Sequence, residues 1–178
     1  MSYKRISDEM ENLLNKQVTK EAEAAQVFLA YGSWADTMSF GGVAEFFYKH
    51  ATEERDHMKK IISYINTRGG KTKIEAISAP PANPKNLKDC LEKALEHEIQ
   101  NSKAIDRIVD LALEEKDWAT FNFAQWFVEE QIEEEALIND LIDKYNLATE
   151  ADENNANLYD LDKDLKSAPQ HISTPREH

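Results

Sequence analysis

The sequence FYKHATEERDHMKKI, residues 47–61, places a carboxylate where a helix would normally bury an apolar side chain. Residues in and just beyond it recur at steps of three and four, which is the spacing of a buried helical stripe. That stripe consists of Phe47, Ala51, Glu54, Met58, Ile61 and Ile65. His57 follows Glu54 by three residues, so both side chains project from one helical face. Taken alone, such a pair is as typical of a solvated helix surface as of a metal site.

Three other predicted helices carry a carboxylate inside a buried stripe in the same way. Their stripes are Leu14, Val18, Glu21, Ala25, Phe28, Gly32 and Ala35 in the first helix, Leu91, Leu95, Glu98, Ser102, Ile105, Val109 and Ala112 in the third, and Phe123, Phe127, Glu130, Glu134, Leu137 and Leu141 in the fourth. None of the four stripes contains Lys or Arg. An ionised carboxylate buried without a partner costs several kcal/mol. Bound cations account for all four helices at once, whereas raised pKa values need a separate reason in each helix.

Length and composition set the class of protein. A chain of 178 residues predicts one domain with a substantial core, and its few Gly and Pro residues favour helix. A net charge of −13 argues against nucleic acid or an anionic membrane as a partner. The single cysteine, Cys90, excludes an internal disulfide and a four-cysteine metal site. No apolar run approaches the length of a membrane span or a signal peptide, so we expect a soluble, cytoplasmic protein.

The helix signals predict an all-α four-helix bundle. Helices are expected after Ser7 to about residue 36, over residues 43–68, after Asn86 to about residue 115, and over residues 118–145 following Asp117. Residues 71–85 contain three prolines and no helical period, and they are long enough to return the chain along the whole bundle. This crossover makes the second and third helices parallel. We predict a bundle over residues 1–147, a linker and short fifth helix over 148–167, and a flexible tail over 168–178.

The crossover also brings the buried carboxylates to one height. With the crossover in place, Glu21, Glu54, Glu98, Glu130 and Glu134 all lie roughly 17–22 Å below the same end of the bundle, at 1.5 Å per residue. Inward carboxylates from four helices with an imidazole describe a dinuclear site for iron or manganese. The fourth helix has Glu133 where a second Glu-x-x-His pair would place its histidine. The site is therefore asymmetric and rich in oxygen, which suits an iron ion that binds, reacts and leaves.

The chain resembles the bacterial non-haem ferritins along nearly its whole length. The matching motifs are NKQ at 15–17, Glu21, Trp34, HATEE at 50–54, His57-Met58, His97-Glu98, TFNFAQW at 120–126, EEQ at 129–131 and Asp143-Lys144. The resemblance implies a ferritin-like bundle that assembles into a shell of 24 subunits. It also implies oxidation of Fe(II) by oxygen or hydrogen peroxide, storage of ferric mineral, and no haem.

The resemblance also implies ligands for three iron positions. Glu21, Glu54 and His57 would bind the first iron. Glu54 as a bridge, Glu98 and Glu134, with Gln131 nearby, would hold the second. Glu53, Glu130 and Glu133, sharing Glu134, match a third position.

One residue departs from the family pattern. Many family members have a tyrosine seven residues after the first-helix glutamate, and this chain has Phe28. Any role of that phenol in oxidation is therefore in doubt here, although Trp126 is a possible redox neighbour.

Other readings make different demands on the sequence. A bacterioferritin would need a second Glu-x-x-His pair and a haem methionine, and a rubrerythrin-like peroxidase would need four cysteines. A diiron oxidase or peroxidase without a storage role is an alternative within the same fold. A metal-free interaction module is an alternative from another class, and it would leave the buried carboxylates unexplained.

Overall fold

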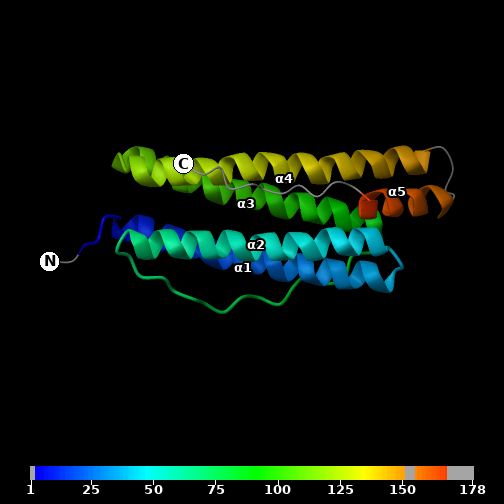
Figure 1. Cartoon of the computed structure of the whole chain (residues 1–178), viewed down its shortest axis with the longest axis horizontal. Helices are drawn as coiled ribbons and strands as arrows, with labels where there is room; N and C mark the ends of the chain where they lie inside the picture. The colour runs from blue at the N-terminus through cyan, green and yellow to red at the C-terminus, as the bar shows by residue number, and fades with distance from the viewer. Residues whose placement is uncertain (1–2, 151–154, 168–178) are drawn as a thin grey trace.

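The computed structural model describes residues 3–150 and 155–167, and every regular element among them is helical. The helices are α1 (Asp8–Thr37), α2 (Gly41–Thr67), α3 (Leu87–Glu115), α4 (Trp118–Glu150) and α5 (Asn155–Ser167). The prediction of an all-α bundle of four long helices with a short fifth helix is confirmed (Figure 1).

The helix starts follow the predicted capping residues. The Ser7 hydroxyl accepts a hydrogen bond from the Met10 amide at 2.9 Å, and the Asn86 Oδ1 accepts one from the Asp89 amide at 2.9 Å. Asp117 Oδ1 accepts from the Thr120 amide at 3.2 Å at the start of α4. These side chains satisfy amides that a helix leaves without internal partners.

The end of α4 differs from the prediction. The helix was expected to end near residue 145, with a linker from residue 148, but α4 continues to Glu150. No glycine or proline interrupts this segment, and the Thr149 hydroxyl donates to the Tyr145 carbonyl at 3.0 Å, which is compatible with a helix. The expected flexible tail, residues 168–178, lies outside the described residues.

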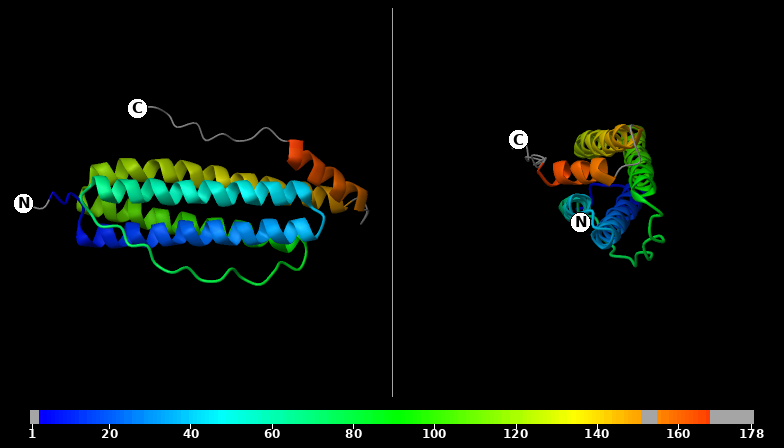
Figure 2. Two further views of the ribbon diagram at one scale, coloured as in Figure 1. Left: turned by 60° about the horizontal axis from the view of Figure 1, so that its bottom comes forward. Right: turned by 90° about the vertical axis from the view of Figure 1, so that its right-hand side faces the viewer.

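The long crossover runs from the end of α2 to the start of α3 along the outside of the α1–α2 pair (Figures 1 and 2). As a result α2 and α3 are parallel, as predicted. The buried Asn15 side chain anchors the crossover to α1. Its Nδ2 donates to the Lys71 carbonyl at 3.0 Å, and its Oδ1 accepts from the Lys73 amide at 2.6 Å.

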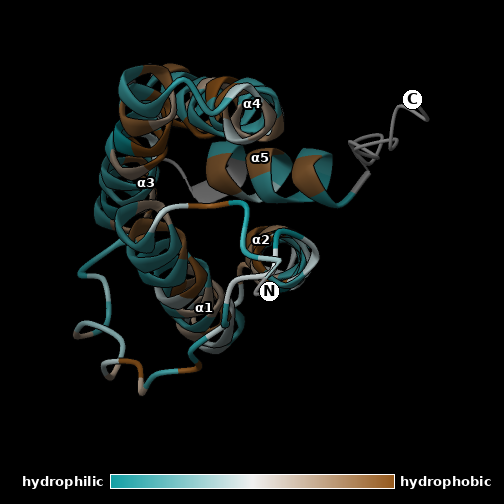
Figure 3. Ribbon diagram, turned by 90° about the vertical axis from the view of Figure 1, so that its left-hand side faces the viewer, coloured by the Kyte–Doolittle hydropathy of each residue, from teal (hydrophilic) through white to brown (hydrophobic). Residues whose placement is uncertain are grey.

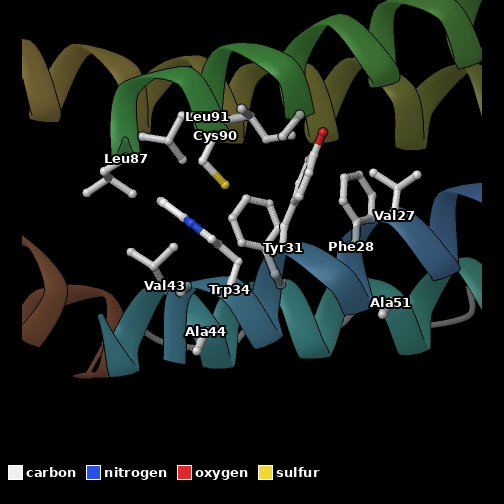
Figure 4. Close-up of a cluster of buried hydrophobic side chains, with 14 of the residues drawn as sticks. Val27, Phe28, Tyr31, Trp34, Val43, Ala44, Ala51, Leu87, Cys90 and Leu91 are labelled. Atoms are coloured by element: carbon white, nitrogen blue, oxygen red, sulfur yellow. The ribbon is translucent and has the colours of Figure 1, made fainter. Parts of the chain in front are cut away.

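Two separate apolar cores fill the bundle, one at each end. The α5-side core includes Phe28, Phe47, Leu91 and Ile138 (Figure 4), and the N-terminal core includes Met10, Leu14, Ile61, Ile105 and Phe127. On every long helix the two cores are separated by a few buried polar residues. These residues, which we call the polar layer, are Gln17, Glu21, His50, Glu54, His57, Glu98, Asn101, Gln131 and Glu134. The predicted convergence of carboxylates at one height is therefore present.

The buried faces of α3 and α4 keep about half of the predicted stripe residues, and at the other positions a neighbouring residue is buried instead. Ala94, Asn101 and Ile108 are buried on α3, where Leu95, Ser102 and Val109 were expected and are only partly buried. On α4, Gln131 and Ile138 are buried in place of Glu130 and Leu137. Two neighbouring residues can fit the helical spacing nearly equally well when both are apolar. Packing against the other helices then decides which of the two is buried.

The short helix α5 contacts α2 and α4 at one end of the bundle (Figure 3). The Asp162 Oδ1 accepts a hydrogen bond from the Val43 amide at 2.9 Å, in the first turn of α2. Within the described parts of the chain, none of the helices is both long enough and apolar enough to cross a membrane.

Candidate metal centre

Six of the predicted site residues lie in the polar layer and come from all four long helices. They are Glu21 on α1, Glu54 and His57 on α2, Glu98 on α3, and Gln131 and Glu134 on α4. Each is at most 9% exposed. Because apolar cores close the bundle above and below, these groups face one another in a dry interior.

The first cluster consists of Glu21, Glu54 and His57. His57 Nδ1 lies 3.3 Å from Glu54 Oε2 and 3.9 Å from Glu21 Oε2. One oxygen or nitrogen from each of the three residues lies within 4.8 Å of the others. Two carboxylates and one imidazole at this spacing can ligate a single divalent ion.

Glu98 and Gln131 lie beside this cluster. Gln131 Nε2 donates to Glu98 Oε2 at 2.9 Å, while the other oxygen, Oε1, has no hydrogen-bond partner. Charge interactions of the Glu54 carboxylate with those of Glu98 and Glu134 contribute to its raised pKa. Burial is the largest cause of that raised pKa. Glu54 thus belongs to the first cluster and also interacts electrostatically with carboxylates outside it.

A second cluster contains a residue that the sequence analysis did not assign, His50. Its Nε2 lies 2.9 Å from Glu134 Oε2, and its Nδ1 lies 3.9 Å from Glu53 Oε2. His50, Glu53 and Glu134 also have potential ligand atoms within 4.8 Å of one another. The spacing held a signal that was not used, because His50 precedes Glu54 by four residues and so lies on its face.

The residues predicted for a third iron position lie at the edge of the polar layer. The side chains of Glu53 and Glu130 are 24% and 15% exposed, and Glu130 Oε2 lies 3.9 Å from His57 Nε2. Glu133 is exposed on α4. These carboxylates form a graded path from the buried clusters toward solvent, with Glu134 as the buried member.

Burial controls the protonation of the layer. Burial, together with neighbouring carboxylates, raises the pKa of Glu21, and it raises the pKa of Glu54 and Glu98 to about 8. Burial lowers the pKa of His50, but the Glu134 carboxylate outweighs it and raises that pKa to about 9. Burial raises the pKa of Glu134, and His50 again reverses the direction, leaving it below the ordinary value. Without a cation, the layer must therefore hold protons on its carboxyl groups near neutral pH.

Unpaired polar atoms also concentrate in the layer. Among the described side chains, seven buried nitrogen or oxygen atoms lack a hydrogen-bond partner, and five of them are His50 Nε2, Glu54 Oε2, His57 Nδ1, Glu98 Oε1 and Glu134 Oε2. The His50–Glu134 and His57–Glu54 pairs are close, but they are not aligned as hydrogen bonds. Buried polar atoms are normally satisfied, so this concentration of unpaired atoms is compatible with a bound ion.

Aromatic rings surround the clusters. Trp126 packs edge-on to the His57 ring at 5.3 Å, and Lys60 Nζ lies 3.8 Å from the centre of the Trp126 ring. Phe28 is fully buried, with its ring edge-on to His50 at 6.2 Å and 5.8 Å from the His97 ring. The ring of Phe28 thus borders the layer without offering it a polar atom.

Comparisons with known proteins agree with this geometry. The model of the ferritin-like domain family matches residues 11–148. The bacterial non-heme ferritin of Campylobacter jejuni is 42% identical over 145 residues, which are 82% of this chain and 87% of that protein. A probable bacterial non-heme ferritin-like protein of Haemophilus influenzae is 39% identical, over 90% of this chain and 95% of its own. An open-pore ferritin from the archaeon Archaeoglobus fulgidus superimposes with a TM-score of 0.88 at 34% identity, covering 92% of this chain and 99% of its own.

Proposed function

Because this chain belongs to the ferritin family and is thereby an iron-storage protein, we propose that it oxidises Fe(II) at a diiron centre within each subunit. The Fe(III) product then collects as mineral inside a hollow shell of 24 subunits. The observation that carries the proposal is the polar layer, in which carboxylates from four helices meet between two apolar cores. The expected cytoplasmic location stays a prediction.

Each substrate ion has its own set of ligands in this proposal. Glu21, Glu54 and His57 bind the first Fe(II). Glu54 also bridges to the second Fe(II), which Glu98 and Glu134 bind with Gln131 beside it. Buried atoms without a hydrogen-bond partner support this assignment. One such oxygen or nitrogen belongs to each of Glu54, His57, Glu98 and Glu134.

The side chains also manage charge during binding. Glu54 and Glu98 hold protons at neutral pH because burial raises their pKa values. Two incoming ions displace those protons, and the released carboxylates then neutralise the ions in a medium that excludes water. Two Fe(II) ions held together can supply two electrons to one molecule of oxygen or hydrogen peroxide.

Departure of the product requires weaker ligands toward solvent. Glu53, Glu130 and Glu133 provide a third iron position in the proposal, with Glu134 shared. Their graded exposure supports this role. His50 contacts both Glu53 and Glu134, so it is a candidate further ligand at the same position.

Anaerobic titration with Fe(II) tests the proposal. We expect two ions to bind tightly per subunit, followed by a rapid rise in ultraviolet absorbance when oxygen or hydrogen peroxide is added. The Glu54→Gln variant removes the bridging carboxylate, and it should lose most of the rapid phase. Absence of stoichiometric binding by the unmodified protein would contradict the proposal and favour a metal-free module.

Storage is tested separately from oxidation. After repeated additions of Fe(II) in air, the shell should retain far more iron than the centres alone can hold, and the iron should sediment with the protein. Oxidation without retained iron would instead favour a ferritin-like oxidase or peroxidase.

A further inference from the structure

Two buried amide side chains in the polar layer have no part in the ligand sets above. Gln17 on α1 is 1% exposed, and Asn101 on α3 is 3% exposed. An amide in a dry interior is costly unless its polar atoms are paired. An apolar side chain of similar size would fill the same space without that cost, so the reason for these amides lies in what they contact.

Asn101 contacts ligands of both proposed iron positions. Its Nδ2 lies 3.5 Å from Glu21 Oε2 and donates to Gln131 Oε1 at 3.4 Å. Gln131 in turn donates to Glu98 Oε2 at 2.9 Å. A continuous hydrogen-bonded chain therefore runs from α1 through α3 to α4 and back to α3.

Gln17 contacts Glu21 and Asn101, at the α1 end of this hydrogen-bonded chain. Its Nε2 donates to Glu21 Oε1 at 2.7 Å and to Asn101 Oδ1 at 2.6 Å. The Glu21 carboxylate is thus held through both oxygens, one by each amide. Rotating it requires the Asn101 amide to move, and that amide also holds Gln131.

We propose that Asn101 is a positioning residue that orients Glu21 toward the first ion and Gln131 toward the second, while Gln17 holds Glu21 directly and reaches Gln131 only through Asn101. The inference rests on the proposed diiron function, because it concerns ligands of that centre. Partners behind the ligands of a metal site fix ligand orientation, and their removal typically lowers metal affinity about 10- to 100-fold.

The test uses Zn(II), which binds the same kind of ligands without redox chemistry. Titration calorimetry gives the first two affinities, and anomalous diffraction from crystals soaked at limiting Zn(II) shows which position is filled. Gln17→Leu should weaken the position at Glu21 and His57 by about 10-fold or more, and it should weaken the other position less, because it acts there only through Asn101. Asn101→Leu should weaken both positions by at least that factor.

A buried asparagine elsewhere separates positioning from simple loss of stability. Asn15 is 5% exposed and bonds the crossover loop rather than the layer. Asn15→Leu should lower the unfolding temperature yet leave both Zn(II) affinities unchanged. If Asn101→Leu does not assemble, Asn101→Ala carries the same expectation for Zn(II).

The outcomes are distinct. Unchanged affinity at either position in the Asn101 variant overturns the role of Asn101 as a link between the two. An equal loss in the Asn15 control also overturns it, because any buried amide would then have the same effect. Failure of the unmodified protein to bind two ions in the layer, with Zn(II) and with anaerobic Fe(II) alike, instead removes the diiron function itself.

Discussion

At the scale of single residues, Phe28 places a ring without a hydroxyl next to the polar layer. It is fully buried beside His50 and His97 and presents only carbon to the polar layer. Glu98 Oε1, in the same layer, has no hydrogen-bond partner. A ring without a hydroxyl cannot donate a hydrogen bond or an electron with its proton, so the proposed oxidation would proceed without a phenol at this position.

Phe28→Tyr restores a hydroxyl at the position where many relatives have one. We expect the rate of Fe(II) oxidation to change severalfold, because the hydroxyl adds a donor beside the centre, while the number of Fe(II) ions bound stays the same. Burying the hydroxyl without a good partner would cost about 1–3 kcal/mol of folding free energy. Rapid-mixing absorbance measures the rate, and Phe47→Tyr in the same core is the control. Equal rates in Phe28→Tyr and the unmodified protein would remove the prediction.

Proton release on metal binding follows from the raised carboxyl pKa values. Glu54 and Glu98, with pKa values near 8, are protonated below that pH and must lose their protons when a cation binds. Zn(II) binding should therefore release protons at pH 6.5, and the number released should fall as the pH passes through 8. Calorimetry in buffers of different ionisation enthalpy counts these protons. Equal proton release at pH 6.5 and 9 would contradict the expected protonation.

The same shift sets how folding depends on pH without metal. The folded-state pKa of Glu54 lies above its unfolded value near 4.5. Between these two pKa values the folded protein keeps a proton on Glu54 that the unfolded chain releases. Its contribution is intact below pH 4.5 and is lost as the pH rises toward 8. Glu54→Gln cannot ionise, so its metal-free form should lose less stability than the unmodified protein between pH 5 and 8. Denaturant unfolding of both proteins measures the difference, and parallel curves would contradict it.

Sequence reasoning identified all four carboxylates of the layer, together with His57 and Gln131, but missed the amides of Gln17 and Asn101 and the imidazole of His50. Glu21, Glu54, Glu98 and Glu134 interrupt apolar stripes, and such an interruption can be seen in the sequence alone. Gln17, His50 and Asn101 each come one residue before a member of a predicted stripe. Each also lies three or four residues from a layer carboxylate, so the spacing was compatible with an inward orientation. How each helix rotates against its neighbours decides which of the compatible positions are buried, and a single sequence does not specify that rotation.

At the scale of elements, α5 completes the start of α2. Phe40, at the N-terminal boundary of α2, makes no side-chain capping bond, and Asp162 on α5 supplies an acceptor to the Val43 amide instead. A carboxylate at a helix N-terminus also interacts favourably with the helix dipole. The close approach depends on Gly42, where an added Cβ would lie 1.8 Å from the Asp162 carbonyl oxygen.

Gly42→Ala should therefore displace α5. We expect faster hydrogen exchange in α5 and the first turn of α2, with a loss of about 1 kcal/mol of stability, as for a lost helix cap. Gly41→Ala is a matched control, since a Cβ there meets nothing within 4 Å. Hydrogen exchange followed by mass spectrometry compares the two variants. Similar exchange in both would show that the contact at Gly42 does not hold α5.

The elements were more predictable than their ends. Caps at Ser7, Asn86 and Asp117 fixed three helix starts because each has a side-chain acceptor at the right spacing. The start of α2 at Gly41 preceded the prediction because its cap comes from α5, which is 119 residues away in sequence. Long-range caps leave no local signal.

At the scale of the whole molecule, the crossover decides whether the centre can form. Because α2 and α3 run parallel, Glu98 lies at the height of Glu54, and the two apolar cores enclose one polar layer (Figure 1). The crossover contains apolar residues, which are the brown segments of this loop in Figure 3. Ile74 in this loop is 73% exposed. A single exposed apolar side chain does not by itself mark an interface, so the role of this loop is decided by experiment.

The proposed shell gives this loop a testable role. Sedimentation of the unmodified protein should show a particle near twenty-four times the 20.4 kDa of one chain. Ile74→Arg should shift it toward smaller species, because a charge buried between subunits without a partner is costly. Glu75→Arg places the same charge on an exposed neighbour that is already polar, and it should still assemble. Intact particles in the Ile74 variant would show that the crossover is not buried between subunits, and a monomeric unmodified protein would rule out storage inside a shell.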